Sequence, residues 1–135
     1  METIFAKDAP TAVGPFSHAM LSNGFLFCSG QVGINPAISQ VDGKSIEEQT
    51  LQVFENIKSV LVSKGLTLAD VVKANVYLTD MANFSKMNSI YAEQFGEHKP
   101  ARTTVAVAAL PLGAIVEMEC IAECKHKIMN TLFNL

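Results

Sequence analysis

Arg102 is the residue of this sequence best suited to bind a small anion. It precedes a strand-like run, 103–110, that carries no charged side chain. An arginine in such a setting either extends to water or meets an anion, and its planar guanidinium matches a carboxylate through two parallel hydrogen bonds. The sequence therefore indicates a clamp for a small carboxylic acid. A surface arginine that pairs with a nearby Asp or Glu at the end of a strand explains the same spacing.

Glu117 is the second candidate, in an alternating run at 114–124. By the two-residue period of a strand, Val116 and Met118 share one face, while Glu117 and Glu119 share the other. A partly desolvated carboxylate in that position can act as a general base toward water. A solvated sheet face gives the same pattern, so both interpretations stay open.

The remaining polar candidates are weaker. Ser29–Gly30–Gln31 ends a short strand-like run and leaves backbone N–H groups available to an anion, and Asn88 lies in the middle of a helical pattern. The sequence has no Ser/His/Asp order, no phosphate-binding loop and no GxGxxG motif, so a nucleotide or flavin enzyme is not indicated. Three cysteines without CxxC spacing and three scattered histidines favour no metal site and no disulfide framework. We expect the cysteines to be small core or interface residues.

The elements that must position these side chains follow from local patterns. Asn23–Gly24 predicts a type I′ turn between two strands, because both residues tolerate positive φ. Ser45 and Glu48 form a capping box that begins a helix, and Gly65 is placed to end it. In chain order we expect strands at 16–22 and 25–29, a loop at 30–43, a helix at 45–65, a strand at 70–78, a helix that opens at Thr79–Asp80 and closes at Gly96, and strands at 103–110 and 114–124.

This β-β-α-β-α-β-β order predicts an α+β domain with two helices on one face of a single sheet. The other face also needs cover, and the chain has no third long helix, so contact with another subunit is the simplest remedy. The length of 135 residues fits one domain, and 49% hydrophobic residues is somewhat apolar for a monomer of this size. We expect the domain to span 1–124, with a C-terminal extension at 125–135 that is either a helix or a loose tail.

Charge and hydropathy exclude several classes of partner. The net charge is −3, and no basic run is longer than Lys125–His126–Lys127, so nucleic acid is not an expected partner. No apolar stretch approaches the roughly 20 residues that span a bilayer, and the first residues lack the order of a signal peptide. We therefore expect a cytoplasmic protein without a membrane anchor.

Several blocks of the sequence are more specific together than any single motif. They are Ala9–Pro10, Gly14–Ser17, Ser29–Gln31, Val71–Met81, Met87–Phe95, Pro100–Val105, Leu110–Pro111 and Val116–Glu119. In this order they resemble the Rid (reactive intermediate deaminase, YjgF-like) family, and the resemblance runs from about Ile4 to Ala122. It implies a chorismate-mutase-like α+β fold assembled as a homotrimer. The sheets would form a central barrel, with the helices outside and three clefts between subunits.

The resemblance also implies an activity. Relatives with arginine at the Arg102 position hydrolyse 2-imino acids, such as 2-iminopropanoate and 2-iminobutanoate, to 2-oxo acids and ammonia, with no cofactor and no metal. Arg102 is then expected to bind the substrate carboxylate, and Glu117 to position or activate the attacking water. The other expected substrate-binding residues are Phe16, Ser29, Gly30, Asn88 and Thr104.

Two departures from the family pattern bear on substrate preference. Phe16 stands where the family motif has tyrosine, and His18 replaces the usual glutamine. Two other functions stay open. One is a trimer that binds small carboxylates, or regulates a partner enzyme, without turnover. The other is the ribonuclease activity attributed to some relatives, which the acidic balance of this chain disfavours.

Overall fold

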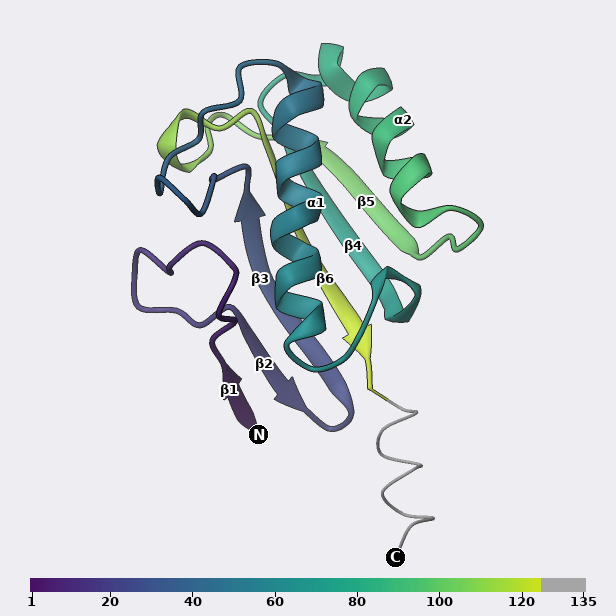
Figure 1. Ribbon diagram of the computed structural model, residues 1–135. Helices are drawn as coiled ribbons and strands as arrows, with labels where there is room; N and C mark the ends of the chain where they lie inside the picture. Colours follow the sequence, from purple (N-terminus) through teal and green to yellow (C-terminus); the bar gives the residue numbers. More distant parts are fainter. Residues whose placement is uncertain (125–135) are drawn as a thin grey trace, which may run out of the picture.

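A six-stranded sheet with both helices on one of its faces forms the protein (Figure 1). The computed structural model describes residues 1–124, and the expected extension at 125–135 lies outside the described residues. The strands are β1 (Glu2–Ile4), β2 (Ala19–Ser22), β3 (Phe25–Val32), β4 (Val71–Leu78), β5 (Ala101–Ala106) and β6 (Val116–Glu123). The helices are α1 (Ile46–Val62) and α2 (Phe84–Phe95), with single 3-10 turns η1 (Leu68–Asp70), η2 (Met81–Asn83) and η3 (Pro111–Gly113). The predicted α+β class and the placement of the helices are confirmed.

The strands lie in the order β1-β2-β3-β6-β4-β5. Only β4 and β5 run parallel, and every other neighbouring pair is antiparallel. The last strand of the described residues, β6, therefore lies in the middle of the sheet, and β5 forms an edge. No helix within residues 1–124 has the length and apolarity needed to cross a bilayer.

Local signals account for most element boundaries. The turn between β2 and β3 has positive φ at Asn23 and Gly24, as predicted. Ser45 caps α1, because its hydroxyl oxygen accepts a hydrogen bond from the Glu48 N–H at 3.1 Å. Asp80 caps η2, which leads into α2, and Gly96 ends α2 with φ of 65°.

Several strand boundaries differ from the sequence expectation, among them the starts of β5 at Ala101 rather than 103 and of β6 at Val116 rather than 114. The run at 16–18 is not a strand, and Pro15 in the turn before it has no N–H to donate. β3 continues through Val32, past an irregularity in its pairing between Cys28 and Gln31. β5 ends at Ala106 rather than at 110, because its partner β4 ends at Leu78 and the Val107 N–H to Leu78 carbonyl bond is the last one between them. The short edge strand β1 was not predicted.

The main core lies between the helices and the sheet. Phe54, Ile57 and Leu61 of α1 pack there with Met87 and Phe95 of α2. Against them lie the inward residues of β4 and β6, among which are Val76, Met118 and Cys120. All three cysteines, Cys28, Cys120 and Cys124, are buried in this core, as expected.

Within residues 1–124 no helix covers the opposite face of the sheet, and we call it the open face. Strand alternation and register place Phe25, Phe27 and Ile121 on it, together with Tyr77 and Val105. Phe27 is 46% exposed and Val105 is 42% exposed. A surface this apolar is typical of one that contacts another protein chain.

Candidate functional site

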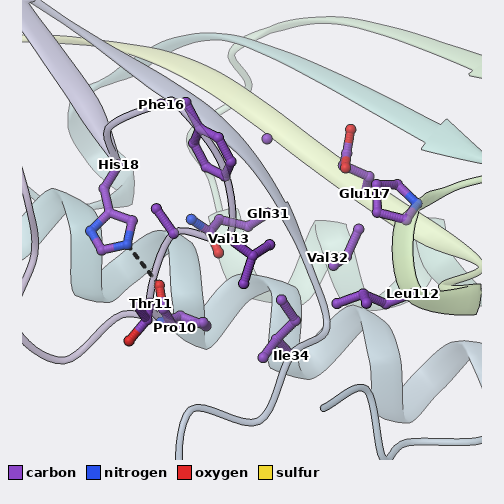
Figure 2. A pocket seen from close by; sticks show the side chains of 13 residues that line it. Pro10, Thr11, Val13, Phe16, His18, Gln31, Val32, Ile34, Leu112 and Glu117 are labelled. Carbon is purple, nitrogen blue, oxygen red and sulfur yellow. Dashed lines mark hydrogen bonds between the residues drawn. The ribbon is translucent and has the colours of Figure 1, made fainter. Parts of the chain in front are cut away.

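A cavity of about 270 Å³ opens beside Glu117 on the open face of the sheet. Figure 2 shows the side chains of Phe16 and Glu117 around this space, with Val13, Val32 and Leu112. Its walls come from the loop before β2, the end of β3, the start of β6 and η3. Among the described residues, Glu117 is the sole charged side chain that lines a mostly apolar space.

Burial is the main reason that the pKa of Glu117 is raised above its ordinary value of 4.5. The neighbouring carboxylate of Glu119, two residues along the same face of β6, raises it further. Glu119 is itself held in place, since its Oε1 accepts hydrogen bonds from the Tyr77 hydroxyl and from Asn75 Nδ2. The hydrogen bond to Glu119 is also the largest cause that raises the pKa of Tyr77 to about 12. A more basic carboxylate is a better proton acceptor near neutral pH.

Gly30 lies against the Glu117 carboxyl group. A Cβ atom at Gly30 would stand 2.9 Å from Glu117 Oε1 and 3.0 Å from its Cδ. The irregular pairing of β3 brings the backbone this close, so glycine is required for the observed position of the carboxylate. The structure therefore brings Phe16, Gly30 and Glu117 together, three of the residues singled out in the sequence.

His18 fixes the loop that forms the wall of the cavity opposite β6. It is buried, its Nδ1 accepts from the Ala6 N–H at 2.8 Å, and its Nε2 lies 2.7 Å from the Pro10 carbonyl oxygen (Figure 2). Because Nδ1 accepts, Nε2 carries the proton and donates to Pro10. His18, which departs from the family pattern, thus links the backbone at Ala6 to the backbone at Pro10 through its two ring nitrogens.

Ser29 lies next to the cavity rather than in its wall. Its hydroxyl donates to the Ser17 carbonyl oxygen at 2.7 Å, and it lines a neighbouring open groove together with Phe16. The predicted end of the strand at 29–31 is wrong, because β3 continues to Val32, and the Ser29 N–H is not free, because it donates to the His18 carbonyl oxygen.

Arg102 lies within β5, on the helix-covered face of the sheet. Its Nη1 donates to Asn88 Oδ1 at 2.7 Å. Its guanidinium lies 4.6 Å from the ring centroid of Tyr91 and 5.6 Å from that of Phe84. These three residues of α2 have the spacing i, i+4 and i+7, so they share one face of the helix.

No carboxylate of residues 1–124 neutralises Arg102. The ion pairs within this part of the chain are Lys58–Glu55 and Lys64–Glu2. The interpretation of Arg102 as a surface arginine paired with a nearby Asp or Glu is therefore wrong for the described residues. The guanidinium is held by an amide oxygen and two aromatic rings, which leave its charge available to an anion.

Thr104 follows on the same face of β5. Its hydroxyl oxygen is buried and has no hydrogen-bond partner among the residues that the structure describes. Arg102, Asn88 and Thr104 thus form one group on the helix side of β5, which we call the arginine group.

Within one chain the arginine group and the Glu117 cavity lie on opposite faces of the sheet. Arg102 pairs with Ala74, which pairs with the inward-facing Cys120. Glu117 instead pairs with Tyr77 on the open face. The two candidate groups cannot contact one substrate inside a single copy.

Sequence reasoning missed three contributors to these groups. Tyr91 was assigned only to the apolar side of a helix, yet its ring supports Arg102. The partners of Glu119, Tyr77 and Asn75, were seen only as strand residues. The i, i+4, i+7 spacing of residues 84, 88 and 91 was the available signal, but only the fold shows that this face meets Arg102. In residues 1–124, no three His, Cys, Asp or Glu side chains are placed to hold a metal ion.

Comparison with known proteins covers nearly all of this chain. A family model described as Endoribonuclease L-PSP matches residues 6–124. A RutC family protein of Pyrococcus horikoshii is 48% identical over 121 residues, which are 90% of this chain and 96% of that protein. Reactive Intermediate Deaminase A of Arabidopsis thaliana, a chloroplastic protein, is 42% identical over 121 residues, which are 90% of this chain and 65% of that protein.

A solved structure from Yersinia pestis shares the fold. It is described as a protein of unknown function of the conserved Rid protein family, and it matches this chain with a TM-score of 0.88 at 46% identity. The match covers 90% of this chain and 98% of that one. The family model thus spans both helices and strands β2 to β6, and the solved structure covers a similar share of the chain.

Proposed function

The chain belongs to the YjgF/Rid family, and from this premise we propose that it hydrolyses 2-imino acids to 2-oxo acids and ammonia. The proposed substrates are of the 2-iminopropanoate and 2-iminobutanoate type, and the reaction uses no cofactor. The proposal also includes a homotrimer in the cytoplasm, with each site built from two copies. A relative named as a reactive intermediate deaminase supports the reaction class.

The setting of Arg102 is the observation that best supports the proposal. It is an arginine held in place by Asn88 and Tyr91, without a carboxylate partner among residues 1–124. A fixed guanidinium recognises a substrate carboxylate through paired hydrogen bonds. Every 2-imino acid carries that carboxylate beside the reacting carbon.

Glu117 supplies the proton transfer in this proposal. Water adds to C2 of the protonated imine, and Glu117 accepts a proton from that water as the C–O bond forms. Glu117 returns that proton to the nitrogen of the resulting carbinolamine. It then accepts the hydroxyl proton as the C–N bond breaks, so that ammonia leaves, the oxygen becomes a carbonyl, and Glu117 is restored when ammonia takes up this proton. The protonated imine is already electrophilic, so orientation and one base each contribute, the base typically by about 10²–10⁴-fold.

The apolar walls of the cavity suit the substrate side chain. Val13, Phe16, Val32 and Leu112 offer contact but no hydrogen bond to an aliphatic group. A cavity of about 270 Å³ leaves room for more than a methyl or ethyl group. Apolar pockets discriminate by only about 10–200-fold per methylene, so we propose activity on a range of imino acids.

The separation of the two groups supports the proposed trimer. The arginine group lies at the edge strand β5 of one copy, and the cavity lies on the open face, whose exposed Phe27 and Val105 favour burial against another chain. Closed rings of three use one repeated contact between two different surfaces of each copy. Such a ring brings Arg102 of one copy to the cavity of the next and covers the open face.

A coupled assay tests the activity. A serine or threonine dehydratase generates the imine, semicarbazide traps what remains, and the protein should suppress the trapped product. Arg102→Ala should weaken binding of pyruvate by about 2–5 kcal/mol, whereas Glu117→Gln should bind pyruvate but lose turnover. Full deaminase activity in Glu117→Gln would refute the assigned base. Wild-type protein that binds pyruvate without suppressing the trapped product would support the alternative of a carboxylate-binding trimer.

A further inference from the structure

Two buried amide side chains of α1, Gln49 and Asn56, bind the backbone of segments that build the Glu117 cavity. Gln49 is 4% exposed and Asn56 is 1% exposed. Their i and i+7 spacing places them on one face of the helix. Buried amides form hydrogen bonds with defined partners, so the partners of these two show which segments α1 holds in place.

Asn56 holds the wall of the cavity that follows β3. Its Nδ2 donates to the Val32 carbonyl oxygen at 3.1 Å and to the Ile34 carbonyl oxygen at 2.9 Å. Its Oδ1 accepts from Gln52 Nε2 at 2.9 Å, which orients the amide so that its N–H groups face those carbonyls. Val32 and Ile34 both line the cavity (Figure 2), whereas Asn56 is not among the lining residues. Asn56 therefore fixes this wall without meeting what the cavity binds.

Gly33 brings the same wall directly against α1. The Ile34 N–H donates to the Val32 carbonyl oxygen at 2.8 Å, so residues 32–34 make a tight turn. A Cβ atom at Gly33 would stand 3.0 Å from the Gln49 carbonyl oxygen and 3.2 Å from Gln49 Cα. The turn thus packs on the helix backbone with no space for a side chain between them.

Gln49 holds the segment that leads to the catalytic candidate of β6. Its Oε1 accepts from the Ile115 N–H at 2.9 Å, and its Nε2 donates to the Gly43 carbonyl oxygen at 2.9 Å. Ile115 precedes Glu117 by two residues. One helix therefore positions both the carboxylate side and the Val32–Ile34 side of the cavity.

The wall has only a small apolar cluster of its own. Val32, Ile34 and Ala114 form this cluster, which is separate from the main core. A cluster of this size offers little packing energy. The hydrogen bonds from α1 are therefore a large part of what fixes the wall relative to Glu117.

We propose that Asn56 is a positioning residue that sets the length of the substrate side chain the cavity accepts, by holding Val32 and Ile34 at a fixed distance from Glu117. This inference rests on the proposed function, in which the aliphatic side chain of the imino acid enters the cavity. An aliphatic ligand gains about fourfold in affinity for each methylene that it buries. A wall that moves away loses this gain for a long side chain and changes little for a methyl group.

Two stable 2-oxo acids of different length test the proposal by calorimetric titration. 2-Oxohexanoate is longer than pyruvate by three methylenes, so the wild-type protein should bind it more tightly. Asn56→Leu keeps a similar volume and removes both hydrogen bonds to the wall. It should weaken 2-oxohexanoate by about fourfold or more, the contribution of at least one methylene, and change pyruvate by less than about twofold.

Gly33→Ala moves the same wall by an independent route, because its methyl group does not fit against the Gln49 backbone. It should cause the same selective loss, and it decides the proposal if Asn56→Leu does not fold. Val60→Ala is the matched control. It removes a buried contact of α1 with the main core, so it should lower Tm and leave the ratio of the two affinities unchanged.

Equal weakening of both ligands in Asn56→Leu and Gly33→Ala would overturn the proposal, because a general defect of the fold acts on both. A changed affinity ratio in Val60→Ala, or no preference of the wild type for 2-oxohexanoate, would overturn it as well.

Hydrogen exchange separates the positioning role from the proposed function. The Ile34 amide should exchange about tenfold faster in Asn56→Leu than in Val60→Ala, the equivalent of one lost hydrogen bond. Equal exchange in the two variants would refute the role of Asn56. Failure of the wild-type protein to bind either 2-oxo acid would count against the proposed function, and exchange at Ile34 would still decide whether Asn56 fixes the wall.

Discussion

The surroundings of Glu117 raise the pKa of its carboxyl group. Its neighbours are the apolar walls of the cavity, the backbone of Gly30 and the fixed carboxylate of Glu119. The first and the last of these disfavour its charged form, so its pKa lies above 4.5 in the folded protein. The folded state therefore binds this proton more tightly than the unfolded state does.

This difference makes stability depend on pH in a defined direction. The contribution of Glu117 is most favourable below the unfolded pKa, near 4.5, and is lost as pH rises through the raised folded pKa. Glu117→Gln removes the ionisation, so its Tm should exceed that of the wild type at neutral pH, and the gap should close toward about pH 4. Calorimetry across this range measures the gap. Glu123→Gln, at the end of the same strand, is the matched control, and a gap independent of pH would contradict the prediction.

Gly30 allows a test that separates geometry from stability. In Gly30→Ala the new methyl group meets the end of the flexible Glu117 side chain, which can rotate away, so Tm should change little. The carboxylate then leaves its observed position, and kcat should fall by about tenfold to a hundredfold while pyruvate binding stays. The imine-trapping assay measures kcat, and calorimetric titration measures pyruvate binding. An unchanged kcat would show that the position of this carboxylate is not critical.

At the scale of elements, the loop before β2 depends on one side chain. His18 joins the Ala6 N–H to the Pro10 carbonyl, and this loop continues into the cavity wall at Val13 and Phe16. His18→Ala leaves a buried N–H and a carbonyl without partners, at about 1–3 kcal/mol for each group. Chemical denaturation and hydrogen exchange at the Ala6 amide measure the effect. His98→Ala, which removes a contact to the Val71 carbonyl, should leave exchange at Ala6 unchanged.

The sequence predicted those elements whose ends carry their own signals. Ser45, Asn23–Gly24 and Gly96 act within a few residues of themselves, so the hairpin and both helices were found. The end of β5 was wrong because it is set by β4, a strand distant in sequence. β1 was missed because three residues are too few to show the alternation of polar and apolar side chains that identifies a strand. The sequence identified the candidate residues by their side-chain types. Which face of the sheet each one lies on depends on how β4, β5 and β6 pair, and local sequence patterns do not show this pairing.

At the scale of the whole molecule, the position of Arg102 and Glu117 on opposite faces of the sheet predicts that two inactive variants restore activity when their subunits are mixed. Arg102→Ala and Glu117→Gln should each be inactive alone. If the proposed sites combine two copies, subunits mixed after reversible dissociation should regain about a quarter of the sites by random assortment. The imine-trapping assay measures this recovery, and light scattering checks for a mass near three times 14.6 kDa in every sample. No recovery in mixed trimers would place each site within one copy.

The position of Arg102 and Glu117 on opposite faces also has a kinetic and a genetic consequence. On the proposed shared site, a newly made chain is inert until it meets others, so the rate at high dilution rises with more than the first power of protein concentration. In the proposed trimer, a copy that lacks both side chains inactivates two sites, one at its edge strand and one at its open face. A doubly substituted allele is therefore dominant over the normal one in proportion to its expression.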